Sequence, residues 1–394
     1  MPVASKISDS VSKSSWIRKM FEEGIRLKAQ FGEENVFDFS LGNPDLSPPV
    51  EFTDTLKALI EKNERGAHGY MPNAGFEDVR EAIAARVSKE QGVDVQGGHV
   101  ITSCGAAGAL NVIFKTILNP GDEVVVPRPY FVEYGTYIDN HRGQIVLADT
   151  NPDFSLNIAN IRAALNEKTR AVLINSPNNP TGRVYPEEDI AALGALIKEH
   201  MESTGRIVYL VSDEPYREIV YDGLKVSSIL RHCTQAIVVT SYSKTLSVAG
   251  ERIGYIAVHP GCVEVDVLLA GLILSTRILG FVNAPALMQR AVARLTGVSV
   301  NVNIYKKRRD LLMEGLKFAG YDFVRPEGAF YIFCKSPIPD DVAFVNHLQK
   351  FNVLTVPGSG FGGAGYFRIA YCVSENIIQR AVPKFKEALE ALRD

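Results

Sequence analysis

Lys244 and Arg252 follow a short segment that has the composition of a buried strand. Residues 237–240 are Ile, Val, Val and Thr, and the chain then runs from Ser241 to Lys244 at the carboxyl end of this expected strand. Ligands of open α/β sheets bind at that end of the strands. A lysine beside an apolar wall loses its proton well below the reference pKa of about 10.4, so its amine can attack an aldehyde and form an imine. Ser241 and Arg252 could hold a phosphate, and the alternative is a solvated strand end with Arg252 paired to an acid.

Two further strand ends carry polar residues with complementary chemistry. Residues 206–213 form an apolar run that ends at Asp213, followed by Tyr216. A carboxylate at the end of such a run needs a partner, and a protonated heterocyclic nitrogen would suit it, whereas the alternative is a cap on the following helix. The run at 171–175 leads into a Pro-Asn-Gly turn that places Asn179 at the same edge, either as a donor to a ligand oxygen or only as a loop-shaping residue.

Three more positions have residue types that suit an anionic, planar ligand. The small residues Gly105, Ala106 and Ala107 open an expected helix and would let a phosphate approach its first N–H groups, unless they only allow close helix packing. Tyr130 ends another strand, where its ring could stack on a planar ligand or pack in the core. Arg368 lies within an apolar strand and needs an anion, either a substrate carboxylate or a structural ion-pair partner.

The elements that must position these residues alternate between strands and helices. Apolar, β-rich runs occur at 123–127, 171–175, 206–213 and 236–241, and the segment 187–203 has apolar residues at helical spacing. This alternation predicts an α/β fold with a doubly wound, mostly parallel central sheet flanked by helices. The segment GFGGAG at 360–365 matches a dinucleotide-binding spacing, but a strand-like segment follows it where a helix is required, so we interpret it as a flexible glycine loop.

The two chain ends are expected to form a second, smaller α+β lobe. Residues 14–30 read as an amphipathic helix with Ile17, Met20, Phe21 and Ile25 on one side, and the last hundred residues mix short strands with helices. We therefore predict a large domain at 46–290 and a small domain at 1–45 and 291–394.

Composition points to small-molecule chemistry. Among 394 residues, 42 Lys and Arg balance 45 Asp and Glu, so the charge gives no argument for nucleic acid or a membrane as partner. The amino terminus lacks the apolar core of a signal peptide, and the most apolar window, 266–282, is interrupted by Ser275, Thr276 and Arg277, which favours a cytoplasmic protein. Five scattered cysteines argue against disulfides and structural zinc, and no metal or hydrolase motif is present.

Taken together, these motifs resemble those of the class I/II aminotransferases, the pyridoxal 5'-phosphate enzymes of fold type I, across essentially the whole chain. The motifs that stand in the family's order and approximate spacing are SLGNPD, GYMPNAGFEDVREAIA, SCGAAGAL, NSPNNPTG, SDEPY, SYSKTLSVAGERIGY and FRIAY. The resemblance implies an enzyme that transfers an amino group from an L-amino acid, with aspartate-type use favoured, to a 2-oxo acid, with 2-oxoglutarate favoured, through a Schiff base on Lys244.

The resemblance also implies individual roles. Lys244, Asp213 and Tyr216 would be catalytic, with Asp213 on the pyridinium nitrogen and with Tyr216 and Asn179 on the phenolic oxygen. Tyr130 would stack on the ring. The implied phosphate contacts are Gly105, Ala106, Ala107, Ser241 and Arg252, together with Tyr70 of a second subunit in a homodimer. The implied substrate contacts are Gly42, Tyr130, Asn179 and Arg368.

Other activities remain open at this point. A carbon–sulfur β-lyase would use the same lysine and aspartate, aromatic or alanine-type transamination is an alternative, and a ligand-sensing module without catalysis is disfavoured because no basic DNA-binding extension is present. An acidic substrate would need a second cation, for which Lys13, Arg18 and Arg277 are candidates.

Overall fold

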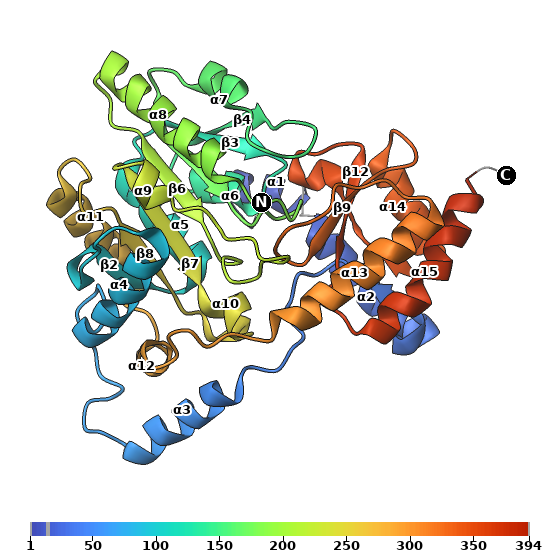
Figure 1. The fold of residues 1–394 in the computed structure, drawn as a ribbon, viewed down its shortest axis with the longest axis horizontal. Helices are drawn as coiled ribbons and strands as arrows, with labels where there is room; N and C mark the ends of the chain where they lie inside the picture. The colour runs from blue at the N-terminus through green and yellow to red at the C-terminus, as the bar shows by residue number, and fades with distance from the viewer. Residues whose placement is uncertain (1, 13–15, 393–394) are drawn as a thin grey trace.

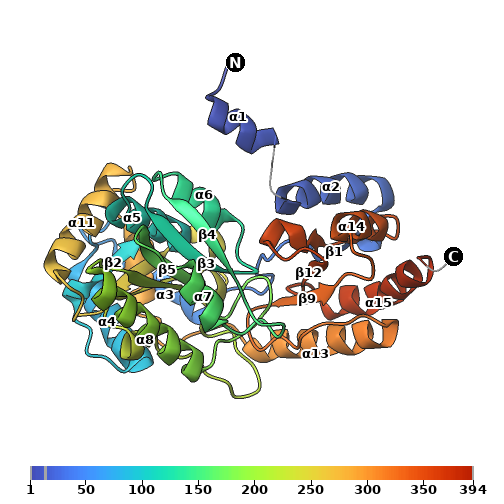
Figure 2. The ribbon, with the colours of Figure 1, turned by 90° about the horizontal axis from the view of Figure 1, so that it is seen from above.

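The computed structural model describes residues 2–12 and 16–392 and has two lobes. Figure 1 shows a sheet wrapped by helices in the larger lobe, and a smaller lobe that contains α2 (Trp16–Phe31) together with the carboxyl-terminal part of the chain. Helix α1 (Ser5–Ser12) stands off the body in Figure 2, on the side of α6 (Glu133–Asp139), where Lys6 forms an ion pair with Asp139.

The larger lobe is built on a seven-stranded sheet. Its strands, in spatial order, are β2 (Val100–Ser103), β8 (Gly254–Val258), β7 (Ala236–Ser241), β6 (Tyr209–Asp213), β5 (Thr169–Asn175), β3 (Glu123–Arg128) and β4 (Gln144–Asp149). Only β8 runs antiparallel to its neighbours, and the other pairs are parallel. The predicted fold class is therefore confirmed.

Alternating residues of each strand face two separate apolar cores. On β5, Leu173 belongs to one core, whereas Val172 and Ile174 belong to the other. The helices that supply the first core are α5 (Gly105–Ile117), α6 and α11 (Val265–Ile278). Those that supply the second are α3 (Val50–Lys62), α4 (Glu77–Gln91), α7 (Ile158–Ala164), α8 (Glu187–Thr204), α9 (Ile229–His232) and α12 (Ala286–Ala293). A sheet covered on both faces needs apolar residues at every position of its strands, which is why the strands read as continuous apolar runs.

The smaller lobe has its own core around short strands. Strands β11 (Val356–Pro357), β12 (Tyr366–Ala370) and β9 (Tyr331–Lys335) form an antiparallel sheet, and β1 (Phe37–Asp38) pairs with β10 (Val353–Leu354). The helices of this lobe are α2 (Trp16–Phe31), α13 (Val302–Ala319), α14 (Asp341–Gln349) and α15 (Glu375–Glu390). Helix α3 projects from the larger lobe in Figure 1, and α10 (Tyr242–Thr245) is a further helix.

The division into domains at 46–290 and at the two chain ends stays a proposal, which the separate cores support. The core of the smaller lobe also includes Phe154, Tyr216, Ile219 and Tyr221, which come from inside the range 46–290. The two lobes therefore share packing at the place where Tyr216 lies. Of the residues expected on one side of the amphipathic helix, Met20 is buried, whereas Ile25 is 57% exposed and Leu27 is buried instead. The side chains of Ile17 and Phe21 lie outside the described residues.

Within the described residues, none of the helices combines the length and the apolar composition that crossing a bilayer requires. The five cysteines are free thiols.

The packing of the sheet generates a stability prediction. Leu173 is fully buried on an interior strand, so Leu173→Ala should leave a cavity and lower the free energy of unfolding by about 2–5 kcal/mol. Urea unfolding measures this change. The control is Leu224→Ala, because Leu224 is 42% exposed and its loss should cost less than about 1 kcal/mol. Equal losses in the two variants would contradict this account of the core.

Candidate active site

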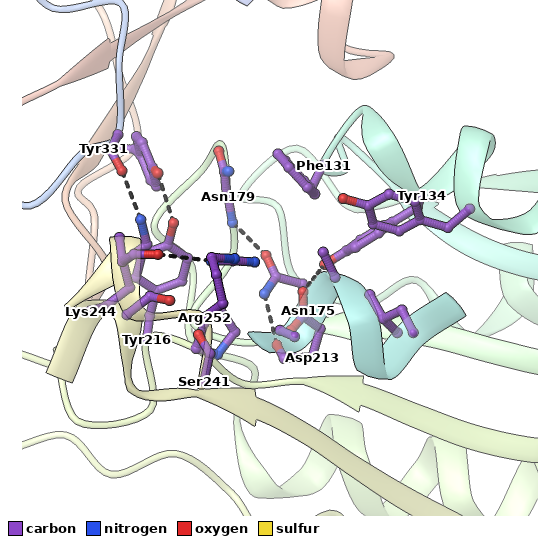
Figure 3. Close-up of a pocket in the computed structure, with 18 of the residues that line it drawn as sticks. Phe131, Tyr134, Asn175, Asn179, Asp213, Tyr216, Ser241, Lys244, Arg252 and Tyr331 are labelled. Atoms are coloured by element: carbon purple, nitrogen blue, oxygen red, sulfur yellow. Dashed lines mark hydrogen bonds between the residues drawn. The ribbon is translucent and has the colours of Figure 1, made fainter. Parts of the chain in front are cut away.

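A cavity of about 280 Å³ lies between the lobes at the carboxyl ends of β5, β6 and β7. Parallel pairing of these strands aligns their ends, with Asn175 opposite Asp213 and Asp213 opposite Val239. Figure 3 shows Lys244 and Tyr216 on one side of this cavity, Asp213 and Asn175 at its floor, and Tyr134 and Phe131 on the far side. The fold thus brings groups from distant parts of the chain to one edge of the sheet.

Asp213 is a buried carboxylate with one oxygen that lacks a partner. The hydroxyl of Tyr134 donates to Oδ2 at 2.6 Å, whereas Oδ1 has no hydrogen-bond partner. Burial raises the pKa of Asp213 to about 7, and the hydrogen bond from Tyr134 opposes this rise. Asp213 caps no helix in this arrangement, and its free oxygen can accept a proton or pair with a cation.

Lys244 lies on α10, one turn after the end of β7. Its Nζ donates to the carbonyl oxygen of Gly42 at 2.8 Å, which comes from the segment that leads out of the smaller lobe. Burial lowers the pKa of Lys244 to about 8, and the nearby guanidinium groups of Arg368 and Arg252 act in the same direction. About a tenth of this amine is therefore neutral and nucleophilic at pH 7, and about half at pH 8.

The first turn of α5 lies beside an arginine and a serine. Gly105 begins the helix with φ +73°, and a Cβ atom there would stand 2.8 Å from Nη2 of Arg252, so only glycine lets the guanidinium come this close. Ser241, at the end of β7, lines the same part of the cavity as Ala106 and Ala107. Free N–H groups, a hydroxyl and a guanidinium together form a site suited to a phosphate.

Arg368 reaches the cavity from β12 of the smaller lobe. It is 1% exposed, and its guanidinium donates to Oδ1 of Asn179 at 3.0 Å and to the carbonyl oxygen of Ser40 at 2.6 Å. It has no carboxylate partner among these contacts, and its Nε is buried without a hydrogen bond. Because a buried cation with neutral partners is costly, Arg368 is available for an anionic ligand rather than for a structural ion pair.

The structure brings most of the predicted site residues together. The predicted residues that line the cavity are Gly42, Ala106, Ala107, Asn179, Asp213, Tyr216, Ser241, Lys244, Arg252 and Arg368. Gly105 lies directly behind Arg252. Their individual roles stay predictions.

Tyr130 and Tyr70 do not line the cavity. The ring of Tyr130 lies near Gly362 of the smaller lobe, and its neighbour Phe131 lines the cavity instead. Tyr70 is 93% exposed on the surface of this chain. Of the candidates for a second substrate cation, Arg277 is exposed on α11, whereas Lys13 and the side chain of Arg18 lie outside the described residues.

Sequence reasoning missed several residues that line the cavity. They are Leu110, Phe131, Tyr134, Tyr137, Asn175, Pro215, Ser243, Ala249 and Tyr331. Asn175 had a usable signal, because it is a polar residue at the end of an apolar strand. Tyr134 gave no usable signal, because Tyr130, four residues earlier, precedes helix α6 and does not line the cavity. Tyr331 gave no such signal within the apolar segment of its strand.

These residues fit the cofactor that the resemblance implies. The partnerless Oδ1 of Asp213 suits a protonated ring nitrogen, and the amino end of α5 with Arg252 and Ser241 suits a phosphate. Lys244 supplies an amine of lowered pKa in the same cavity. Three separate features of the cavity thus match three separate groups of pyridoxal phosphate.

Comparison with known families gives one match that spans most of the chain. The family model described as aminotransferase class I and II matches residues 34–385. Among curated proteins, the aspartate/prephenate aminotransferase of Thermus thermophilus is 32% identical over 98% of this chain and 97% of its own length. The probable aspartate aminotransferase of Methanocaldococcus jannaschii is 31% identical over 96% of this chain and its full length.

Solved structures agree with this match. An aminotransferase from Eubacterium rectale superposes with a TM-score of 0.97 at 36% identity, covering 100% of both chains. The aspartate aminotransferase of Thermus thermophilus, solved with maleate, superposes with a TM-score of 0.86 at 31% identity, covering 95% of this chain and 97% of that one.

The raised pKa of Asp213 predicts how stability depends on pH. In the cofactor-free protein the folded state holds the Asp213 proton up to about pH 7, whereas an unfolded aspartate loses it near its ordinary pKa of 3.8. The contribution of Asp213 to the free energy of unfolding is fully present below the pKa of the unfolded state, and it is lost as the pH rises through the pKa of the folded state. Asp213→Asn should therefore lose less stability than wild type between pH 4.5 and pH 8, as measured by urea unfolding.

The control for this measurement is Asp78→Asn, at an exposed position on α4, which should follow the wild-type profile. A pH profile of Asp213→Asn that is parallel to wild type would show that Asp213 is ionised in the cofactor-free protein.

Proposed function

Because the chain belongs to the class I and II aminotransferases, which depend on pyridoxal phosphate, we propose that it moves an amino group from an aspartate-type L-amino acid to 2-oxoglutarate. Enzymes of this family act on amino acids and 2-oxo acids. The observation that carries the proposal is one cavity that holds the amine of Lys244, at a lowered pKa, together with the partnerless oxygen of Asp213. The aspartate preference is supported by relatives named as aspartate aminotransferases and by one solved with maleate, a dicarboxylate.

The cofactor supplies, when bound, an aldehyde that bonds to amino groups and a protonated ring that accepts electrons from the substrate's α-carbon. Asp213 would hold the ring nitrogen protonated, and Tyr216 and Asn179 would bond the phenolic oxygen. The residues proposed to hold the phosphate are Gly105, Ala106, Ala107, Ser241 and Arg252, and Tyr130 is proposed to contact the ring from the edge of the cavity.

Lys244 is proposed to take the proton from the substrate's α-carbon. Its pKa of about 8 places it near the operating pH, where an amine both accepts and returns a proton efficiently. The carbonyl of Gly42 accepts a hydrogen bond from Nζ and so fixes where the amine points when it is not covalently engaged. Burial thus gives this lysine the two properties that the role requires, a neutral form and a defined position.

Arg368 is proposed to bind the substrate's α-carboxylate. Asn179 accepts one guanidinium hydrogen bond through Oδ1, which leaves its amide N–H groups free to donate to the same ligand, and the backbone at Gly42 lies alongside. The cations among the described lining residues are Lys244, Arg252 and Arg368, and each already has a proposed role. The distal carboxylate of an aspartate-type substrate therefore needs a cation from outside this lining.

We propose that the active form is a homodimer in which Tyr70 contacts the phosphate of the partner subunit. Tyr70 is almost fully exposed, and apolar side chains of α3 and α11 such as Val50 and Val267 are 67% and 68% exposed. Figure 1 shows α3 projecting away from the larger lobe, and its Phe52 packs against the core of that lobe whereas Val50 and Ile60 are exposed. Exposed apolar side chains on a projecting helix are typical of an interface. A cytoplasmic location is proposed with it, because the five cysteines are free thiols.

The role of Lys244 generates the first test. Borohydride reduction of the protein with bound cofactor should attach the label to Lys244, and Lys244→Ala should carry no label. Transamination by this variant should fall on the order of 10⁴-fold or more, because the general base and the nucleophile are both lost. Lys198→Ala, at an exposed position on α8, is the control and should keep both label and turnover. A label that maps to another lysine would refute the proposal.

The proposed donor preference generates the second test. The enzyme with bound cofactor is mixed with aspartate, phenylalanine, alanine or a thioether amino acid, without an acceptor, and the half-reaction is followed by absorbance. Aspartate should react fastest, by roughly 10- to 100-fold, because one additional charge-assisted contact is worth about 1.5–3 kcal/mol.

Product analysis completes this experiment. Transamination gives one equivalent of oxo acid per enzyme in the absence of an acceptor. Continuous release of pyruvate and ammonia from the thioether substrate would instead identify a β-lyase, and faster reaction with phenylalanine would overturn the aspartate preference.

A further inference from the structure

The hydroxyls of Tyr216 and Tyr331 form a hydrogen-bonded pair inside the cavity. Their oxygens are 2.7 Å apart, and either atom could be the donor. Tyr216 follows β6 of the larger lobe, whereas Tyr331 is the first residue of β9 in the smaller lobe. Both residues line the cavity and both are nearly fully buried. Figure 3 shows the two hydroxyls meeting beside Lys244. The pair therefore connects the two lobes at the proposed site of reaction.

A tyrosine hydroxyl has a single proton, so the direction of this hydrogen bond matters. If Tyr216 donates to Tyr331, it has no proton left for a ligand oxygen. If Tyr331 donates to Tyr216, the proton of Tyr216 is free to point into the cavity. The proposed contact of Tyr216 with the cofactor's phenolic oxygen requires the second arrangement.

The surroundings of Tyr331 favour it as the donor. Its ring centroid lies 4.6 Å from Cζ of Arg368, and this cation opposes the rise that burial causes in the pKa of Tyr331, which is about 12. Burial also raises the pKa of Tyr216, and Arg368 opposes that rise too. The rings differ in how close a cation lies, because the nearest approach of Lys244 Nζ to the Tyr216 ring centroid is 5.9 Å, whereas the guanidinium packs directly on the ring of Tyr331. This closer cation polarises the hydroxyl of Tyr331 more strongly and makes it the better donor.

The backbone at Gly42 holds the hydroxyl of Tyr331 in place. A Cβ atom at Gly42 would lie 1.9 Å from this oxygen, so only a glycine at this position leaves room for the hydroxyl of Tyr331. The carbonyl of the same glycine accepts the hydrogen bond from Lys244. The position of Tyr331 is therefore fixed by the same residue that orients the lysine.

We propose that Tyr331 is a positioning residue whose hydroxyl donates to Tyr216 and thereby directs the only proton of Tyr216 toward the ligand in the cavity. Its ring also lies against Arg368, so the residue joins the proposed carboxylate site to Tyr216. This inference rests on the proposed function, because it takes the phenolic oxygen of the cofactor as the acceptor for Tyr216.

The test is an absorbance titration of the enzyme with bound cofactor, without substrate. A hydrogen bond from Tyr216 stabilises the ionised phenolic oxygen and lowers the pH at which the chromophore titrates. Tyr331→Phe should raise that apparent pKa by roughly half a unit, the scale of one weakened hydrogen bond. A lower apparent pKa would show that Tyr216 donates to Tyr331, and an unchanged value would show that the pair is uncoupled from the cofactor. Either result overturns the inference.

A double mutant separates a positioning role from a structural one. Tyr216→Phe should raise the apparent pKa more than Tyr331→Phe, and the double variant should match Tyr216→Phe alone, because Tyr331 acts through Tyr216. Additive shifts would contradict this. Tyr331→Phe should lower kcat about 3- to 10-fold with little change in KM for the amino donor, since the ring beside Arg368 is retained. Tyr331→Leu removes that ring and should also raise KM.

Tyr371→Phe is the matched control. Tyr371 is fully buried and bonds the hydroxyl of Tyr221 at 3.3 Å, but it does not line the cavity, so its loss should leave the chromophore titration unchanged. Urea unfolding of each variant confirms that it is folded. If the wild-type protein shows no cofactor chromophore, the proposed function itself is refuted. If the wild-type chromophore titrates normally and Tyr331→Phe does not change its apparent pKa, only this inference is refuted.

Discussion

The site depends on burying three ionisable groups around one cavity without giving any of them a counter-ion. Asp213 has one oxygen without a partner, Arg368 bonds only neutral oxygens, and the amine of Lys244 bonds a backbone carbonyl. Burial favours the neutral form of each group, which is why the pKa of Asp213 is raised and those of Lys244 and Arg368 are lowered. The cationic ring nitrogen and the aldehyde of the cofactor would supply partners for Asp213 and Lys244, and the carboxylate of the substrate would supply one for Arg368. The chemistry of the site follows from this imbalance.

The two-lobed fold is what makes this burial possible. The strand ends of the larger lobe present Asp213 and Lys244, but β12 of the smaller lobe brings Arg368 over them, and the segment at Gly42 closes one side. Tyr216 belongs to the core of the smaller lobe although it follows a strand of the larger one. The cavity is therefore a property of the contact between the lobes, and a change in that contact alters the environment of all three groups together.

The sequence predicted the parts of the site that local pattern determines. Asp213 and Lys244 are recognisable because each follows an apolar run that must be a buried strand, and Arg368 because a cation within such a run needs an anion. Tyr134 and Tyr331 were missed because their importance depends on which hydroxyl they meet across the fold, and nothing in their own segments indicates it. Tyr130 and Phe131 are adjacent aromatics, and only tertiary packing decides which of them lines the cavity. Ile25 matched a helical apolar pattern, but the packing of α2 buries Leu27 instead. The role of Tyr70 depends on a second subunit, which one chain does not specify.

The polar contacts around the buried groups explain how the site stays ordered without its ligand. Tyr134 satisfies one oxygen of Asp213 and leaves the other free, and Asn179 occupies one edge of Arg368 while keeping its own donors available. Each partner thus satisfies only part of the group that it contacts. Full satisfaction, for example by a carboxylate on Arg368, would stabilise the cofactor-free protein but would have to be broken when substrate binds. Because each group is only partly satisfied, its burial lowers the free energy of unfolding of the ligand-free protein. A ligand that binds only the folded state supplies the missing contacts and restores that stability. The same imbalance that lowers the stability of the empty protein therefore contributes to the affinity for its ligands.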